Sequence, residues 1–153
     1  LKSVMKSLFN KEDNAEMIAR IRKINAESKP SWGKIDAAGM LFHLQEPIRV
    51  SLGELKLKRG LAGFLFGKMA LKQVLSDKPF KKGVPTSDKF KPFGNYDLEA
   101  EKEKLVNLVS SLAEKGPSAI SSNPHPFFGV LTPEQWSIIT WKHLDHHLTQ
   151  FGA

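Results

Sequence analysis

Four segments of the chain carry apolar residues at the 3.6-residue spacing of an amphipathic helix, and this periodicity constrains the fold more than any other feature. The first spans residues 13–27, and Pro30 is expected to end it because the residue before a proline is pushed out of the helical region. Its apolar stripe contains Met17, Ile21 and Ile24. The second begins near Asp36, whose side chain can accept a hydrogen bond from a first-turn amide.

The other two helical segments have clear boundary signals. The third spans residues 97–115 and is expected to stop at Gly116, which suits a helix C-terminus. The fourth opens at Thr132, with Pro133 at the first helical position and Gln135 at the position that closes a capping box. Together the four segments predict an all-α protein.

The connection between the second and third segments is longer than forty residues. An antiparallel helical hairpin needs only about 2–8 residues, so this length favours a crossover that lets the two helices run parallel. Residues 60–75 predict a further short helix within it. Residues 77–94, with three prolines and two glycines, predict irregular chain.

Length and composition limit the class of protein. The 153 residues predict a single domain, 1–153, and a content of 41% hydrophobic and 25% charged residues is typical of a soluble globular protein. No apolar run approaches the ~20 residues that span a bilayer, so no membrane partner is expected. The chain begins at Leu1 and shows no secretory signal, and a cytoplasmic location is expected. Cysteine is absent, which excludes disulfides and thiolate ligands.

The basic residues gather in one part of the chain. Residues 53–96 hold ten basic and three acidic side chains. The net charge of this stretch, +7, equals the net charge of the whole chain. This basic crossover can steer an anionic cosubstrate toward a site, or it can be a solvated loop without a role. No DNA-reading helix is recognisable in it, so DNA is not an expected partner.

Three of the five histidines lie in HLDHH, residues 143–147. On a wheel of 100° per residue, His143 and His147 fall inside the apolar arc of the fourth segment, and His146 falls on its margin. An unpaired polar nitrogen on a buried face costs about 1–3 kcal/mol, so these two imidazoles need a partner. A divalent metal satisfies both, because histidines at i and i+4 can reach one ion. The glutamate of HExxH metalloprotease sites is missing here.

The remaining histidines leave alternatives open. His43, at the edge of the second segment's apolar arc, is either a third ligand or a half-buried core residue with one hydrogen bond. His125, between two prolines, is a fourth ligand, a residue behind the ligands or a loop residue at the mouth of the site. The tryptophans, including Trp32, are expected in the core or at a rim.

Three stretches resemble a known family. PSWGKIDAAGMLFH, HPFFGVLTPEQW and KHLDHHLTQFG resemble the DinB/YfiT superfamily of metal-binding four-helix bundles, in a branch marked by a terminal HxxHHxxQFG motif. The resemblance implies an up-down-down-up bundle, which accounts for the long basic crossover between helices 2 and 3. It also implies that His43, His143 and His147 bind the metal. His125, His146, Trp32 and Gln150 are then expected behind the ligands or at the pocket rim.

The resemblance also implies a class of chemistry. Its members include thiol-dependent isomerases and transferases, so a divalent-metal-dependent enzyme is expected, with zinc or nickel as the ion. The candidate activities are a transferase acting with a low-molecular-weight thiol and a small-molecule hydrolase. Because the chain has no cysteine, an anionic thiol would be a cosubstrate. The alternative is a non-catalytic, stress-related binding protein with a structural metal, and a homodimer is a candidate assembly.

Overall fold

The computed structural model describes residues 4–83 and 94–153. These residues form five α-helices and one short 3-10 helix: α1 (Lys11–Arg22), α2 (Ala37–Ser51), α3 (Leu61–Val74), α4 (Leu98–Lys115), η2 (Pro117–Ala119) and α5 (Pro133–Gln150). The described ranges contain no strand, only an isolated bridge between His125 and Gly129. The predicted all-α class is therefore confirmed. Most of the stretch predicted to be irregular, residues 84–93, lies outside the described residues.

Most helix ends lie where the sequence predicts them. The Asp36 side chain accepts from the amide of Gly39 at 2.7 Å and caps α2. The capping box of α5 is present, with the Thr132 hydroxyl accepting from the Gln135 amide and the Gln135 side chain accepting from the Thr132 amide. Gly116, which follows α4, has a φ of 69°, a conformation that side chains with a Cβ disfavour.

The prediction for the first helix is wrong at both ends. The helix begins two residues early, because the Asn10 side chain accepts from two first-turn amides. It ends at Arg22 instead of at Glu27, well before Pro30. Beyond it, the side chains of Asn25 and Ser28 accept from nearby backbone amides and form a turn. Local side-chain hydrogen bonds therefore end the helix before the proline does.

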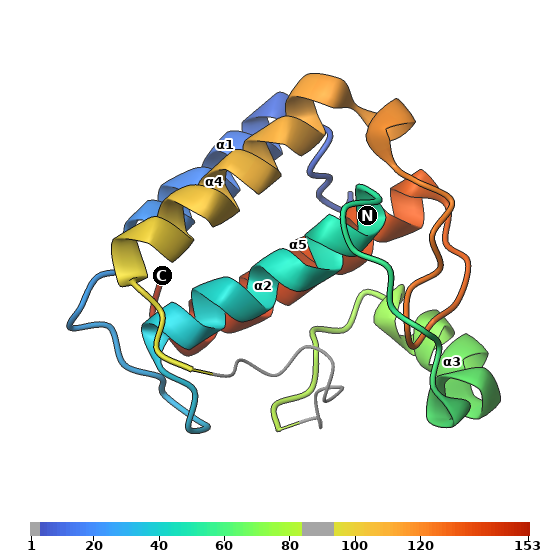
Figure 1. The fold of residues 1–153 in the computed structure, drawn as a ribbon, viewed down its shortest axis with the longest axis horizontal. Helices are drawn as coiled ribbons and strands as arrows, with labels where there is room; N and C mark the ends of the chain where they lie inside the picture. Colours follow the sequence, from blue (N-terminus) through green and yellow to red (C-terminus); the bar gives the residue numbers. More distant parts are fainter. Residues whose placement is uncertain (1–3, 84–93) are drawn as a thin grey trace.

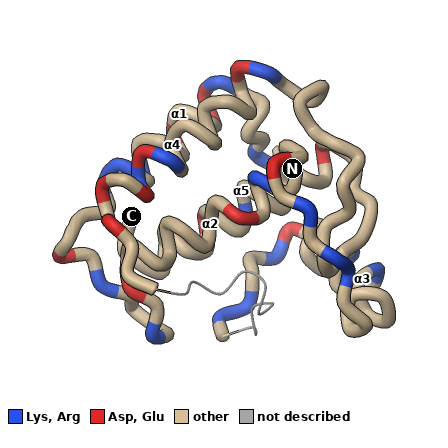
Figure 2. Tube along the Cα trace, in the orientation of Figure 1, with Lys and Arg blue, Asp and Glu red and all other residues tan. Residues whose placement is uncertain are grey.

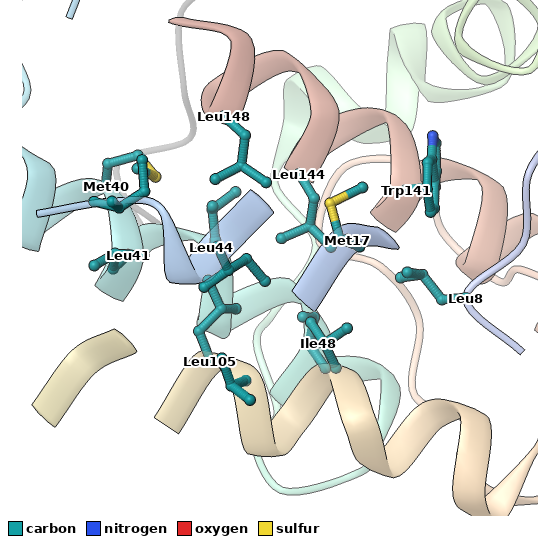
Figure 3. Close-up of a cluster of buried hydrophobic side chains, with 14 of the residues drawn as sticks. Leu8, Met17, Met40, Leu41, Leu44, Ile48, Leu105, Trp141, Leu144 and Leu148 are labelled. Carbon is teal, nitrogen blue, oxygen red and sulfur yellow. The ribbon is translucent and has the colours of Figure 1, made fainter. Parts of the chain in front are cut away.

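Four helices surround the core, and each packs against two others: α2 packs on α4 and α5, and α1 also packs on α4 and α5. Figure 1 shows α1 and α4 side by side, with α3 set apart at one end of the molecule. The core between the four helices is made mainly of leucine, isoleucine, valine and methionine side chains with little or no exposed surface. Figure 3 shows this cluster, including Met17, Leu44, Ile48, Leu105 and Leu144.

Two polar side chains tie α1 to its neighbours. Asn14 is buried and donates at 2.7 Å to the carbonyls of Leu8 and Val109, which joins the N-terminal segment to α4. The Arg20 guanidinium donates to Asp145 at 2.6 Å and to Thr149 at 3.2 Å, both on α5. The Arg20 contacts fix α1 against α5, the helix that carries HLDHH.

The helix α3 is attached to the body through its glycines. A Cβ at Gly63 would lie 2.6 Å from the carbonyl oxygen of Phe127, and a Cβ at Gly67 would lie 2.4 Å from the same atom. Only glycine permits this close approach of two backbones. Near the C-terminal end of α3, Leu71 and Val74 also pack against the buried cluster that contains Trp136 and Ile139.

Figure 2 shows basic residues along the chain that leads into α3 and on α3 itself. Within residues 4–83 and 94–153, no helix has the combination of length and apolarity that spanning a membrane requires.

Candidate metal centre

Two neighbouring helices bring three histidines to one point. α2 carries His43, and α5 carries His143 and His147 one helical turn apart. One ring nitrogen from each histidine lies within 4.8 Å of the other two, and the Nε2 atoms of His43 and His143 are 2.9 Å apart. Among the described residues this is the group of three potential ligands that comes together. His43 is almost completely buried, which contradicts the half-buried alternative.

The rings are arranged around a common centre. Ring centroids are separated by 4.8 Å for His43 and His143 and by 4.9 Å for each of the other two pairs. The ring planes cross at 81°, 82° and 76°, so no two rings are stacked. Two nitrogens that each bind one ion at ~2.0–2.1 Å are themselves roughly 3 Å apart. The His43 and His143 nitrogens already have that spacing, and a His147 nitrogen lies within 4.8 Å of both, so the three residues could hold a divalent ion.

The electrostatic environment keeps the two α5 rings, those of His143 and His147, neutral. Burial lowers the pKa of His143 well below its ordinary value, and the neighbouring imidazoles of His43 and His147 lower it further. Burial, followed by His43, lowers the pKa of His147 from 6.5 to about 4. A neutral imidazole has a free lone pair, which metal ligation requires. Both rings are therefore ready to bind a cation at neutral pH.

A hydrogen-bond chain orients the His147 ring. The Gln150 Nε2 atom donates to the Trp32 carbonyl at 2.6 Å, and this fixes the direction of the amide because a carbonyl only accepts. The Gln150 Oε1 atom then accepts from Nδ1–H of His147, at 2.7 Å. This assigns the proton of the neutral ring to Nδ1 and leaves the Nε2 lone pair available. Gln150, predicted to lie behind the ligands or at the rim, lies behind His147 and contacts it.

Aromatic rings separate the cluster from a surface pocket. The His146 ring centroid lies 5.1 Å from that of His147 and 5.6 Å from that of Trp32. The Phe80 ring lies 6.0 Å from His146 and 6.3 Å from His143. Trp32, Phe80 and His146 all line a surface pocket of about 170 Å³. Trp32 and His146 therefore lie at a pocket rim.

Two lysines belong to the same pocket and differ in their surroundings. The Lys82 ammonium lies 4.2 Å from the centre of the Trp32 ring. The Lys142 ammonium donates at 2.6 to 2.7 Å to three backbone carbonyls at or beyond the end of α3, those of Val74, Ser76 and Lys78. These bonds satisfy carbonyls near a helix terminus and hold the segment that leads to Phe80 against α5.

Comparison with protein families shows to which family the chain belongs. The family described as protein of unknown function (DUF1569) matches residues 6–153. The chain belongs to this family. The match includes all five α-helices and all five histidines. Among the curated proteins and the solved structures, none matches the chain.

In this DUF1569 protein His125 is buried in the loop before α5. Its backbone exchanges two hydrogen bonds with Gly129, and its ring packs on Phe128 and Trp136. The Nδ1 atom accepts from the amides of Phe127 at 3.0 Å and Phe128 at 3.2 Å. The ring therefore supports the loop against which α3 packs, and it does not line the pocket next to the histidine cluster.

The buried ring of His125 predicts a pH-dependent loss of stability. Burial lowers its pKa from 6.5 to about 3. Between these two pH values the ring binds a proton in the unfolded chain and stays neutral in the folded chain. Stability is full above pH 6.5 and falls as the pH drops toward the folded pKa. His125→Asn keeps an acceptor at the δ position but does not titrate. Between pH 7.5 and about pH 4.5, wild type should lose roughly 2–3 kcal/mol more than this variant.

Urea unfolding of both proteins with a chelator present measures this difference. The lost ring contacts should make His125→Asn less stable at every pH, so only the change with pH is informative. Parallel pH profiles would show that His125 titrates normally.

Sequence reasoning missed Phe80 and the role of Lys142 in this DUF1569 protein. Phe80 lies in a stretch without periodicity, so nothing in the sequence signals that its ring approaches two histidines. Lys142 lies outside the α5 apolar arc, where a lysine is usually solvated, and its carbonyl partners are more than sixty residues away.

Proposed function

We propose that this DUF1569 protein is a divalent-metal-dependent enzyme in which His43, His143 and His147 hold zinc or nickel. The proposal includes one domain over residues 1–153, the up-down-down-up bundle of the DinB/YfiT superfamily and a cytoplasmic location. The observation that carries it is the convergence of three imidazoles from two helices, with ring centroids 4.8 to 4.9 Å apart and planes crossing steeply. Three histidine donors are one of the ligand sets found in catalytic zinc sites, which keep one position open.

When bound, such an ion lowers the pKa of a coordinated water or thiol and so supplies a nucleophile at neutral pH. The protein's residues supply orientation and selection. Gln150 holds the His147 ring in the tautomer that leaves Nε2 free. Phe80 and His146 lie between the cluster and the pocket and limit the access of water.

The pocket favours an anionic cosubstrate with a small apolar part. Trp32 and Phe80 supply aromatic surface, and Lys82 supplies a positive charge beside them. The acidic residue of the pocket, Asp145, already pairs with Arg20 at 2.6 Å. Because the chain contains no cysteine, a thiol nucleophile must enter with a second molecule. We therefore propose a transferase that uses a low-molecular-weight anionic thiol.

Two other functions make different predictions for the same protein. A small-molecule hydrolase would need the ion but no thiol. A stress-related binding protein with a structural metal would depend on the ion for stability and would offer no exchangeable position.

A spectroscopic titration of nickel-loaded protein with mercaptoacetate tests the proposal. A saturable near-ultraviolet sulfur-to-nickel charge-transfer band is expected, because the thiol reaches the open position. Hydroxyacetate, which lacks the sulfur, should produce no band, and Lys82→Gln should weaken thiol binding about fivefold at low salt, by loss of one charge contact.

Two results would overturn the thiol proposal. The absence of a band together with metal-dependent cleavage of small esters would assign a hydrolase. The absence of both, with a lower melting temperature after metal removal, would assign a structural metal.

A further inference from the structure

The outward face of α3 carries large apolar side chains in contact with solvent. Five of them have more than half of their surface exposed: Leu61 74%, Phe64 71%, Leu65 62%, Phe66 53% and Met69 71%. Single exposed apolar residues are common on soluble proteins, whereas contiguous patches mark contact sites. Five on one helix of fourteen residues make such a patch, which we call the α3 face.

None of these five side chains belongs to a buried cluster, and the Arg59 guanidinium lies 5.7 Å from the centre of the Phe64 ring. α3 approaches the loop at residues 125–129 through Gly63 and Gly67, which meet the Phe127 backbone. A surface helix usually turns its large apolar residues inward and its small ones outward. In the N-terminal half of α3 the glycines face inward and the large apolar residues face outward. Packing within the chain therefore does not explain why these exposed residues are apolar.

Basic residues surround the α3 face. From residue 55 to residue 76 the chain has five basic side chains and no acidic one. The basic residues are exposed and lie just before α3 or in its second half: Lys56, Lys58, Arg59, Lys68 and Lys72. A partner of this surface must therefore offer both apolar contact and negative charge.

The shape of the α3 face narrows the choice of partner. On a helical wheel of 100° per residue, all five apolar side chains fall within an arc of about 200°. Phe64 and Phe66 lie at the two ends of this arc, and Leu65 lies at its middle. The face is thus a broad convex ridge on a helix set apart from the other four (Figure 1). A rigid groove would have to enclose more than half of the helix, whereas a fluid lipid surface adapts to it. A second copy docked face to face would place five cations against five.

We infer that the α3 face binds the surface of an anionic membrane, with α3 lying in the plane of the interface. Leu61, Phe64 and Leu65 would enter the headgroup region, and Lys68 and Lys72 would contact lipid phosphates. Fourteen residues make a helix of about 21 Å, too short to span a bilayer but sufficient to lie on it. The expectation of no membrane partner rested only on the absence of a segment long enough to span a bilayer, and a helix that lies on the membrane surface does not need one. It is independent of the metal centre.

Flotation of the full chain with lipid vesicles tests the inference. Vesicles of phosphatidylcholine with about one third phosphatidylserine should carry the protein at low salt, and pure phosphatidylcholine vesicles should not. Phe64→Ser with Leu65→Ser should reduce binding at least tenfold. Lys68→Gln with Lys72→Gln should also reduce it tenfold or more, since each cation near the surface contributes roughly fivefold.

Matched variants elsewhere on the surface serve as controls. Val4→Ser with Met5→Ser removes exposed apolar groups, and Lys11→Gln with Lys23→Gln removes exposed charges on and beside α1. Both should float like wild type, and circular dichroism should show all variants folded. No flotation with the anionic vesicles, or equal flotation of all variants, would overturn the inference. A concentration-dependent dimer that Phe64→Ser with Leu65→Ser dissociates, without vesicle binding, would assign the face to a second copy instead.

Discussion

Proteins carrying His43→Ala, His143→Ala or His147→Ala are expected to purify without stoichiometric metal, whereas His146→Ala retains about one equivalent. Each of the first three removes one of the ring nitrogens that lie within 4.8 Å of one another. The two donors that remain are fewer than the three or four protein ligands of zinc sites. The His146 ring lies beside this cluster and lines the pocket, so its removal leaves the three donors in place.

Elemental analysis of the four variants, purified in parallel with wild type, measures this result. His146→Ala is a close control, because it makes the same substitution on the same helix within one turn of both α5 ligands. Equal metal content in all four variants would contradict the assignment, and so would loss of metal from His146→Ala alone.

Gln150→Leu is expected to weaken metal binding by about 10–100-fold without abolishing it. The substitution removes the oxygen that accepts from His147 Nδ1–H and the amide that donates to the Trp32 carbonyl. Partners behind a metal ligand fix its ring orientation and basicity, and their loss typically has this magnitude. Gln150→Glu keeps an acceptor for the ring and should retain more affinity than Gln150→Leu.

Competition with a chromophoric chelator measures the affinities. Gln73→Leu makes the same substitution at an exposed position of α3 and should bind metal like wild type. If Gln150→Leu and wild type bound metal equally well, the hydrogen bond would have no part in orienting the ring.

The helical period predicts much of the candidate site. Because α5 is a regular helix, the helical wheel places His143 and His147, but not His146, inside its apolar arc. In the structure these two histidines lie together with His43. That the three bind metal stays a prediction. The partner of His147 follows less directly, because the role of Gln150 depends on the Trp32 carbonyl, which another segment supplies.

Features that depend on tertiary contacts are not predictable from the pattern. The sequence predicts a helix at residues 60–75, but its orientation depends on the close approach of Gly63 and Gly67 to the Phe127 carbonyl, some sixty residues away. Periodicity alone assigns large apolar residues to the inside, and here five of them lie outside. The early end of α1 is missed for a similar reason, since the side chains of Asn25 and Ser28 form a turn that the apolar stripe does not reveal.

A crystal structure of the metal-loaded protein, with anomalous scattering recorded at the zinc and nickel edges, tests the central claim most directly. The account predicts one anomalous peak within ~2.0–2.3 Å of a ring nitrogen from each of His43, His143 and His147, with a non-protein ligand completing the coordination. A peak bound by other side chains, or three imidazoles bonded to one another with no ion in protein that contains metal, would contradict it.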